Sequence, residues 1–316
     1  MGKIHDLVER LGRNEAKRAV PADQQHVVNL AADFLGDEGA INPAYIYSGF
    51  CLTALPHKAL PPDQPWTRET PRVTLIVSPG FVPNGRGGAE PVGCPYGSRA
   101  RLVLLWLQTQ AVRSSSREIE LGRSMNNWLS KMNVSVGGNS YKGIHEQIKR
   151  LAKCQISFHW TDDNGRSRFE QAQVAKGGVF NFADSDPRQG VLWEDHVKLS
   201  EEFYSALRTH PVPVAEGAIK ALSSKSMAID CYVWLAYRLH SLERPTSLSW
   251  PALYAQFGHS YKELRHFREE FIKVLQAALA VYPEARVTDE GDKGITLYPS
   301  APPIPERLDD RRLLLG

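Results

Sequence analysis

Apolar residues recur at helical spacing near the N-terminus of the chain. Between residues 3 and 35 they fall three and four positions apart, which predicts two short amphipathic helices. Pro21 and Asp23 mark the start of the second helix. A proline-rich connector over residues 55–71 and a strand over 72–77 follow, then a segment at 78–97 with six Gly and four Pro. We expect that last segment to be a mobile loop.

The pattern becomes regular after residue 97. Ser98 is a suitable N-cap for an apolar helix over 99–112. A short strand at 119–121 and helices over 124–132 and 140–153 follow. Alternating apolar residues at 156–160 and 169–174, separated by Asn164–Gly165, predict a β-hairpin. Helix, strand, helix, helix, hairpin is the element order of a winged helix.

The same order of elements recurs about 125 residues later. A helix over 225–241 and a strand at 248–250 precede a helix that starts at Pro251 and ends at Gly258. Ser260 is expected to cap a long helix that reaches about residue 279, with Leu264, Phe267, Phe271 and Leu275 facing the core. Residues 285–298 form a second hairpin. Between the two repeats lie a strand-like segment at 191–199, a helix capped by Ser200 and the Pro-bounded corner 211–213.

These elements predict an α+β, mainly helical fold with two tandem winged-helix domains and an N-terminal helical extension. We place the extension and the glycine- and proline-rich loop at 1–95, the first winged helix at 96–212, the second at 213–300 and a C-terminal tail at 301–316. The corner at 211–213 is the expected domain boundary, because proline restricts the residue before it to extended backbone.

The distribution of charge along the chain says more than its sum. The 316 residues carry a net charge of only +3. Residues 96–159, however, hold ten Lys and Arg against three Glu, a net charge of +7, while residues 225–275 carry +2. Clustered cations favour DNA because binding releases the counterions of its phosphates.

The third helix of each repeat is the one expected to enter the major groove. If Ile144, Ile148 and Leu151 face the core, the polar residues of that helix face outward. In the second repeat Arg265 is suited to bidentate contact with guanine, although an ordinary solvated helix face explains both patterns as well. The expected DNA-binding side chains are Lys142, His145, Lys149, Arg150, Lys153 and Arg123, then Lys262, Arg265, His266, Arg268, Arg286 and Lys293.

Motifs of common enzymes are missing from the sequence. It has no G-x-x-x-x-G-K-[ST] loop, no H-x-x-x-H pair and no G-x-S-x-G elbow. Its four cysteines lie far apart and form no C-x-x-C pair. We therefore expect no catalytic residues, no metal and no cofactor. No apolar run approaches membrane-spanning length and no signal peptide is recognisable, which favours a cytoplasmic protein without a membrane partner.

Several separated motifs, in order, resemble the RepA-type (TrfA-like) plasmid replication initiator family. The resemblance covers roughly residues 45–305 and leaves 1–44 and the tail uncovered. The segments that carry it are Pro95–Arg101, Arg117–Ser124, Gly137–Gly138, Glu146–Leu151, Ala228–Leu239, Ser249–Trp250, Gln256–Gly258 and Tyr282–Pro283, with Ala54–His57 upstream.

This resemblance implies binding to direct repeats (iterons) in origin double-stranded DNA, opening of an adjacent AT-rich segment, and recruitment of the host initiator and helicase, with the sliding clamp as a further candidate. It also implies exchange between dimers and DNA-bound monomers. Two linked winged helices would occupy successive major grooves about 10–10.5 base pairs apart. Two alternatives stay open: a tandem winged-helix transcriptional repressor that does not open an origin, and a winged-helix protein-interaction module.

Overall fold

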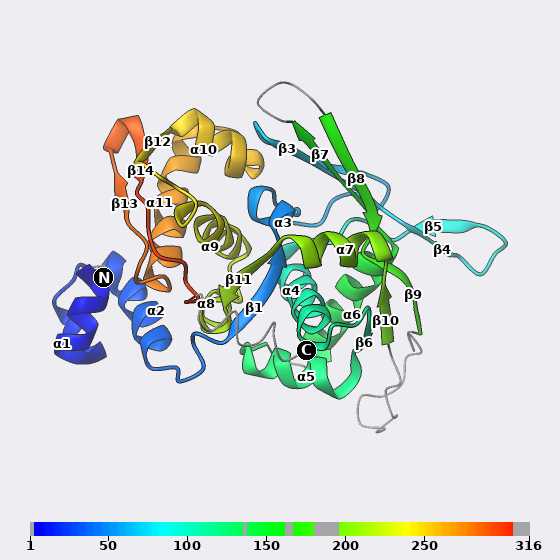
Figure 1. The fold of residues 1–316 in the computed structure, drawn as a ribbon, viewed down its shortest axis with the longest axis horizontal. Coiled ribbons are helices and arrows are strands. Elements are labelled where there is room, and N and C mark those ends of the chain that lie inside the picture. Colours follow the sequence, from blue (N-terminus) through cyan, green and yellow to red (C-terminus); the bar gives the residue numbers. More distant parts are fainter. Residues whose placement is uncertain (1–2, 135–137, 162–166, 180–195, 306–316) are drawn as a thin grey trace. The chain divides into compact units, whose positions relative to one another are not determined.

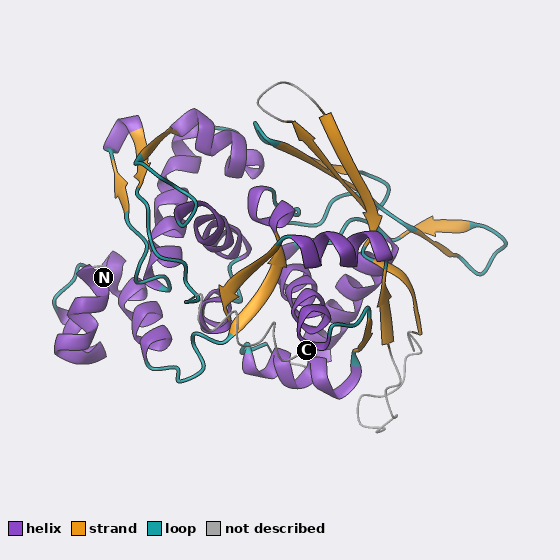
Figure 2. Cartoon of the chain, viewed as in Figure 1, coloured by secondary structure: helices purple, strands orange, loops and turns teal. Residues whose placement is uncertain are grey.

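The computed structural model describes residues 3–134, 138–161, 167–179 and 196–305. Its contacts divide the chain into two compact units, coloured by position in sequence in Figure 1. We call residues 45–211 the central unit, and residues 1–44 together with 212–315 the terminal unit. Small antiparallel sheets alternate with helices in both units (Figure 2), so the α+β, mainly helical class is confirmed.

The central unit contains five helices among its described residues and most of the strands. The helices are α3 (Ser48–Leu52), α4 (Gly97–Ser114), α5 (Gly122–Lys131), α6 (Gly138–Lys153) and α7 (Glu201–Thr209). The strands are β2 (Trp66–Glu69), β3 (Val73–Ser78), β4 (Phe81–Pro83), β5 (Ala89–Pro91), β6 (Glu118–Glu120), β7 (Gln155–Thr161), β8 (Ser167–Gln173), β9 (Ala175–Val179) and β10 (His196–Leu199). The chain passes from one unit to the other within β1 (Pro43–Tyr47) and again within β11 (Pro211–Ala215).

The core of the central unit is built around α4. Most of this helix is buried, and Trp106 is completely covered. The apolar face of α6 packs inward through Ile144, Ile148 and Leu151, as the sequence pattern predicted. The four-stranded sheet, in the order β2-β3-β7-β8, buries one side of each inner strand, for example at Phe158.

The terminal unit combines the two ends of the described chain. Its elements are α1 (Lys3–Arg18), η1 (Ala22–Gln24), α2 (Gln25–Leu35), α8 (Glu216–Leu222), α9 (Ser226–Leu239), β12 (Thr246–Ser249), α10 (Trp250–Phe257), η2 (Gly258–Ser260), α11 (Leu264–Ala280), β13 (Val287–Asp289), η3 (Gly291–Lys293) and β14 (Gly294–Leu297). The two predicted N-terminal helices are present, and they share a core cluster with Ala280 of α11. Residues 1–44 therefore pack as part of this unit.

One module recurs in both units. In the terminal unit it runs α9, β12, α10, α11, β13, β14, and the sheet order is β12-β14-β13. In the central unit it runs α4, β6, α5, α6, then β9 and β10, with the order β6-β10-β9. In each sheet the last strand lies between the other two, so the two modules have the same strand topology.

The structure corrects which hairpin closes the first module. The hairpin expected at 156–174 is present as β7 and β8, but it extends the sheet that begins with β2 and β3. Its turn at Asn164–Gly165 lies outside the described residues. The strands that pair with β6 are instead β9 and β10. The segment expected to be a loop also contains the short β4–β5 hairpin, and the proline-rich connector contains β2.

The predicted helix starts are right at some positions and wrong at others. Ser200 caps α7 by accepting a hydrogen bond from the Phe203 amide at 3.1 Å, and Gly258 follows the last residue of α10. Ser98, in contrast, lies inside α4, which begins at Gly97. Ser260 belongs to η2, so α11 starts four residues later, at Leu264. Leu264 was expected to face the core, but it is 40% exposed.

Candidate nucleic-acid interface

Three lysines share the outer face of α6. Lys142, Lys149 and Lys153 are spaced by seven and four residues, and at about 100° per residue they lie within about 40° of one another around the helix axis. Ile144, Ile148 and Leu151 occupy the opposite, buried side. Lys142 and Lys153 are exposed, whereas Lys149 and His145 are half-buried. The structure thus brings four of the predicted residues onto one helix and separates them from its core face.

Arg150 has a different role from the three lysines. Its guanidinium binds Glu146 at 2.6 Å, donates to the Cys94 carbonyl at 3.0 Å and lies 5.0 Å from the centre of the Tyr96 ring. The side chain is only 13% exposed. Arg150 therefore fixes α6 against the segment before α4. It also neutralises Glu146, the only acidic residue of α6.

Arg99 is a cation beside α6 that the sequence reasoning left out of the interface. It is exposed at the start of α4, and its guanidinium lies where a side chain on Gly143 would be. The Arg99 guanidinium therefore occupies the space that Gly143 leaves open on α6. A glycine among the apolar and basic residues of α6 was the sequence signal for this contact.

Three basic residues lie at the start of α11. Lys262, Arg265 and His266 are exposed, and the Arg265 side chain is 82% accessible with its Nε 3.3 Å from Glu269. The buried side of the same helix carries Phe267 and Phe271. The structure therefore places the predicted residues of this helix at its N-terminal end, on the side away from the core.

Arg268 connects α11 to the hairpin that follows it. Its guanidinium binds Asp292 at 2.5 Å and lies 5.2 Å from the Trp250 ring centre. The Trp250 indole donates to the Gly291 carbonyl at 2.7 Å, so both residues hold the 3-10 turn between β13 and β14. Of the predicted residues of this hairpin, Lys293 is exposed and Arg286 donates to the Pro299 carbonyl.

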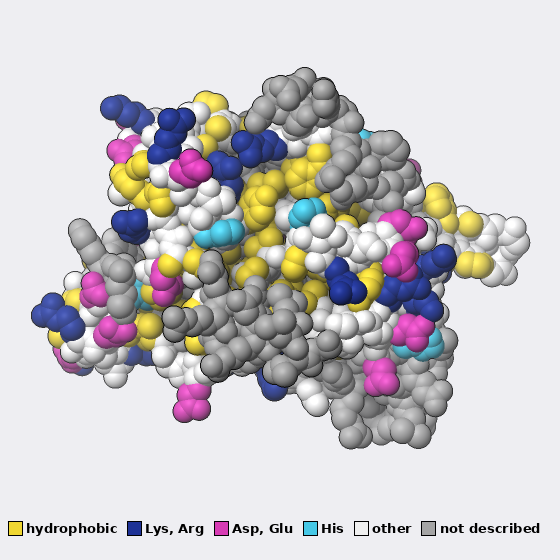
Figure 3. Space-filling view, in the orientation of Figure 1, with side chains coloured by type: hydrophobic (Ala, Val, Ile, Leu, Met, Phe, Trp, Pro, Cys, Tyr) yellow, Lys and Arg dark blue, Asp and Glu magenta, His cyan; other side chains and the backbone are white. Residues whose placement is uncertain are grey.

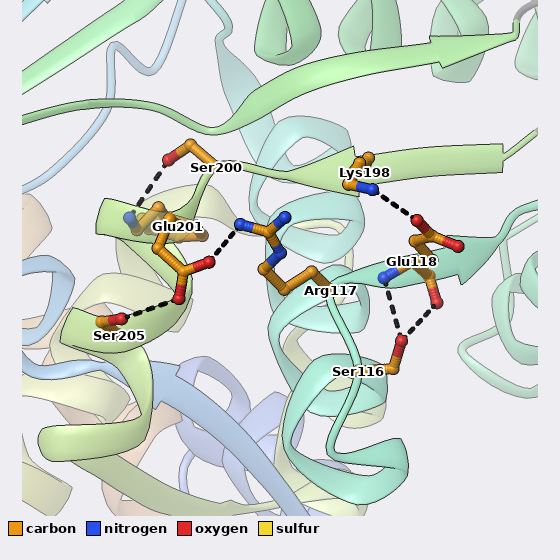
Figure 4. Close-up of polar contacts among 8 residues, drawn as sticks. Ser116, Arg117, Glu118, Lys198, Ser200, Glu201 and Ser205 are labelled. Atoms are coloured by element: carbon orange, nitrogen blue, oxygen red, sulfur yellow. Dashed lines mark hydrogen bonds and ion pairs between the residues drawn. The ribbon is translucent and has the colours of Figure 1, made fainter.

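Arg117 of the basic segment and Lys198 of β10 form ion pairs inside the central unit. Figure 4 shows Arg117 pointing at Glu201 of α7, and Lys198 of β10 pointing at Glu118 of β6. The Lys198–Glu118 distance is 2.6 Å, and the hydrogen bond from Lys198 holds the pKa of Glu118 below its ordinary value. These pairs fasten the three-stranded sheet of the first module.

Arg101 and Arg123 also belong to the basic segment. Arg101 is buried and donates to backbone carbonyls, among them that of Leu55 at 2.6 Å. The predicted residue Arg123 belongs to α5, but its side chain lies outside the described part of the structure. Of the ten Lys and Arg of residues 96–159, Arg101, Arg117 and Arg150 therefore bind groups within the central unit, and three lysines lie on the outer face of α6.

The described residues offer little for metal or thiol chemistry. Within them, no group of three or more His, Cys, Asp or Glu side chains is arranged to hold a metal ion. All four cysteines are buried as free thiols, and burial raises the pKa of Cys51, Cys154 and Cys231 well above the ordinary range. Among the helices of the described segments, none combines the length and apolar character needed to cross a bilayer.

Comparison with solved structures identifies the class of fold. The crystal structure of selenomethionine derivatives of domains 2 and 3 of RctB matches with a TM-score of 0.52 and 11% identity, over 82% of this chain and 100% of that chain. A second crystal structure of RctB domains 2–3 matches with a TM-score of 0.42 and 12% identity, over 84% and 99% of the two chains. The chain thus has an α+β fold like that of RctB domains 2 and 3.

Comparison of sequences identifies the family. The family described as plasmid-encoded RepA protein matches residues 94–251, which is half of the chain, so the chain belongs to this family of plasmid replication proteins. Members are generally non-catalytic and bind DNA. No curated protein sequence matches the chain. The matched region begins just before α4 and ends at the start of α10, so it contains the whole face of α6 described above.

Proposed function

We propose that this chain is a non-enzymatic plasmid replication initiator that binds direct repeats in origin double-stranded DNA. In this proposal each repeated module is a winged helix, with α6 and α11 as the helices that enter the major groove. The observation that carries it is the outer face of α6, where Lys142, Lys149 and Lys153 lie together opposite the buried face. Such a face gains affinity from every phosphate that it neutralises.

The second recognition helix supplies base contacts. In helix-turn-helix proteins the N-terminal residues of the recognition helix reach the base edges. Lys262, Arg265 and His266 have this position at the start of α11 and are exposed. Arg268 keeps the β13–β14 hairpin in place beside the helix, and Lys293 of that hairpin contacts the DNA backbone. The remaining predicted residue, Arg286, donates to the carbonyl of Pro299, which follows β14, and so supports the end of the hairpin.

The family supports the origin as the DNA target. We propose that binding to the repeats bends or untwists the duplex, which is least costly at flexible steps, and so opens the adjacent AT-rich segment. The host initiator, the helicase and the sliding clamp are the proposed protein partners, and exchange between dimer and monomer is proposed to regulate binding. None of these steps needs hydrolysis by the chain itself.

Footprinting on the plasmid origin tests the proposal. We expect protection of a repeated site of about two helical turns if each module occupies one major groove. Fluorescence anisotropy at increasing salt should give a steep negative slope of log affinity against log salt, and a flat slope would contradict the proposal. A single-strand-specific probe then tests opening: a bound origin that stays double-stranded favours the repressor instead.

A further inference from the structure

The β4–β5 hairpin projects from the central unit without a visible structural role there. Figures 1 and 3 show it extending away from the other elements of that unit. Residues 83–90 are exposed on both sides of the ribbon, and Phe81 is 60% exposed. An isolated two-stranded hairpin is marginally stable in water, and this one buries little surface that would stabilise the fold.

The tip of the hairpin presents one arginine on almost bare backbone. Arg86 is flanked by Gly85, Gly87 and Gly88, and it is the only Lys or Arg between residues 73 and 98. Gly85 and Gly87 have φ of 72° and 81°, and a Cβ at either would meet open space. The Asn84 carboxamide oxygen accepts hydrogen bonds from the amides of Arg86 at 2.9 Å and Gly88 at 3.0 Å, which closes the turn.

Both legs of the hairpin are held by the last turn of α6. On the first leg, a Cβ at Gly80 would overlap the Lys153 carbonyl, so the two backbones touch. On the second leg, Arg150 donates to the Cys94 carbonyl at 3.0 Å. Between the legs, the Val92 amide donates to the Gly80 carbonyl at 2.9 Å. The direction of the hairpin is therefore set by the same helix that carries the lysine face.

We propose that this hairpin is a minor-groove arm that places Arg86 in A·T-rich DNA beside the α6 site; the inference rests on the proposed function of α6. Six residues from Gly80 to Arg86 span at most about 20 Å. Half a helical turn of duplex, which separates a major groove from the next minor groove, is about 17 Å. The arm is thus long enough to cross one phosphate ridge.

The chemistry of the tip fits a narrow minor groove. The groove is about 6 Å wide, and A·T pairs offer only acceptors there, whereas a G·C pair adds the guanine amino group. Narrow A·T-rich grooves have an enhanced negative potential that attracts inserted arginine. Apart from Asn84, whose side chain is bonded to the turn, the neighbours of Arg86 at the tip are glycines and add little width to it. Within residues 84–88 Arg86 is the only charged side chain, and the one acidic residue of the hairpin, Glu90, lies farther back on β5, so the tip offers a protein partner few side chains.

The test compares full-length variants on duplexes that share one footprinted site and differ only in the flank. The flanks are A·T, G·C or inosine·C, because inosine lacks the guanine amino group in the minor groove. Arg86→Ala should bind the A·T and inosine·C duplexes about tenfold more weakly than wild type, a loss of about 1.4 kcal/mol. It should equal wild type on the G·C duplex. Hydroxyl-radical protection of the flank should disappear only in Arg86→Ala.

Arg72→Ala is the matched control, because Arg72 is also exposed and lies at the far end of β3. It should bind like wild type on every duplex. An Arg86→Ala variant that loses affinity equally on all three flanks touches only phosphate, and one that matches wild type on all of them does not contact the flank. Either result overturns the proposal that the hairpin is a minor-groove arm. If the wild-type chain shows no specific binding to any of the duplexes, that result overturns the proposed function of α6 instead.

Discussion

Removal of the lysine face of α6 should change the salt dependence of DNA binding more than any other feature. The variant replaces Lys142, Lys149 and Lys153 by alanine. Alanine has the highest helix propensity, so α6 should keep its structure. The buried residues of the helix and the Arg150–Glu146 pair are left in place. The variant therefore removes three positive charges and keeps the buried apolar face of α6.

The magnitude follows from the number of phosphates released. Each neutralised phosphate contributes about 0.9 to the slope of log affinity against log salt. A fourfold rise in salt therefore costs about 3.5-fold in affinity per contact, and three contacts cost about 40-fold. The triple variant should bind more weakly than wild type at low salt. Its slope should be shallower by about 2.7, which leaves the two proteins closer in affinity at high salt.

Fluorescence anisotropy from about 50 to 200 mM salt measures both slopes. The control removes the same charge elsewhere, by alanine at Arg10, Lys58 and Arg72, which are exposed and lie outside the proposed interface. Its slope should equal that of wild type, apart from the small effect of net charge. Equal slopes for the two triple variants would refute the assignment of α6 to the DNA backbone.

Three other variants test separate parts of the argument. Arg265→Ala should weaken specific binding by about 1–3 kcal/mol and non-specific binding much less. Equal losses of specific and non-specific binding in a competition assay would show that Arg265 contacts only phosphate. Arg150→Ala removes a mostly buried arginine, its ion pair with the exposed Glu146 and its charged hydrogen bond to the Cys94 carbonyl, so urea unfolding should show a loss of about 2 kcal/mol. Burial lowers the pKa of His5, which is 3% exposed, so unfolding takes up a proton below the ordinary pKa of about 6.5. Stability should fall as pH decreases below that value, and His5→Gln should flatten this dependence; an unchanged profile would exclude His5 as its source.

Helical periodicity was the part of the sequence that determined structure most directly. Ile144, Ile148 and Leu151 are buried as predicted, because one side of an amphipathic helix has to face the core. The Ser200 cap was recognisable because a serine hydroxyl before a helix satisfies a free amide. These signals depend on residues close together in sequence.

The pairing of the strands could not be predicted from the sequence, for a physical reason. Alternation identifies a strand and the face it buries, but it does not identify the strand beside it. β7 and β8 alternate clearly, yet they join β2 and β3, which come before the module. β9 contains Gly177 and Gly178, which have low strand propensity, so nothing in its sequence marked it as the partner of β10.

The role of each single Lys or Arg could not be predicted from the sequence either. A helical wheel places Arg150 at the edge of the polar face, where it resembles a DNA contact. Its partner is the carbonyl of Cys94, fifty-six residues away, and only the folded chain brings the two together. Leu264 has the helical spacing of the buried residues of α11, but it is the first residue of that helix and is 40% exposed, because the helix begins after Glu263 and not after Ser260.

The pairing of the cations distinguishes the two proposed recognition helices. Every Lys and Arg of α11 lies beside a carboxylate: Arg265 at Glu269, Arg268 at Asp292 and Lys273 at Glu270. The helix α6, in contrast, carries four Lys and Arg and one Glu, a net charge of +3, against +1 for α11. A carboxylate beside a cation reduces its attraction for phosphate but leaves guanidinium donors available to a base edge. We therefore infer that α6 supplies most of the salt-dependent affinity and α11 most of the discrimination between sequences. Substitutions in α6 should then alter binding to all duplexes, and substitutions at the start of α11 should alter the preferred repeat.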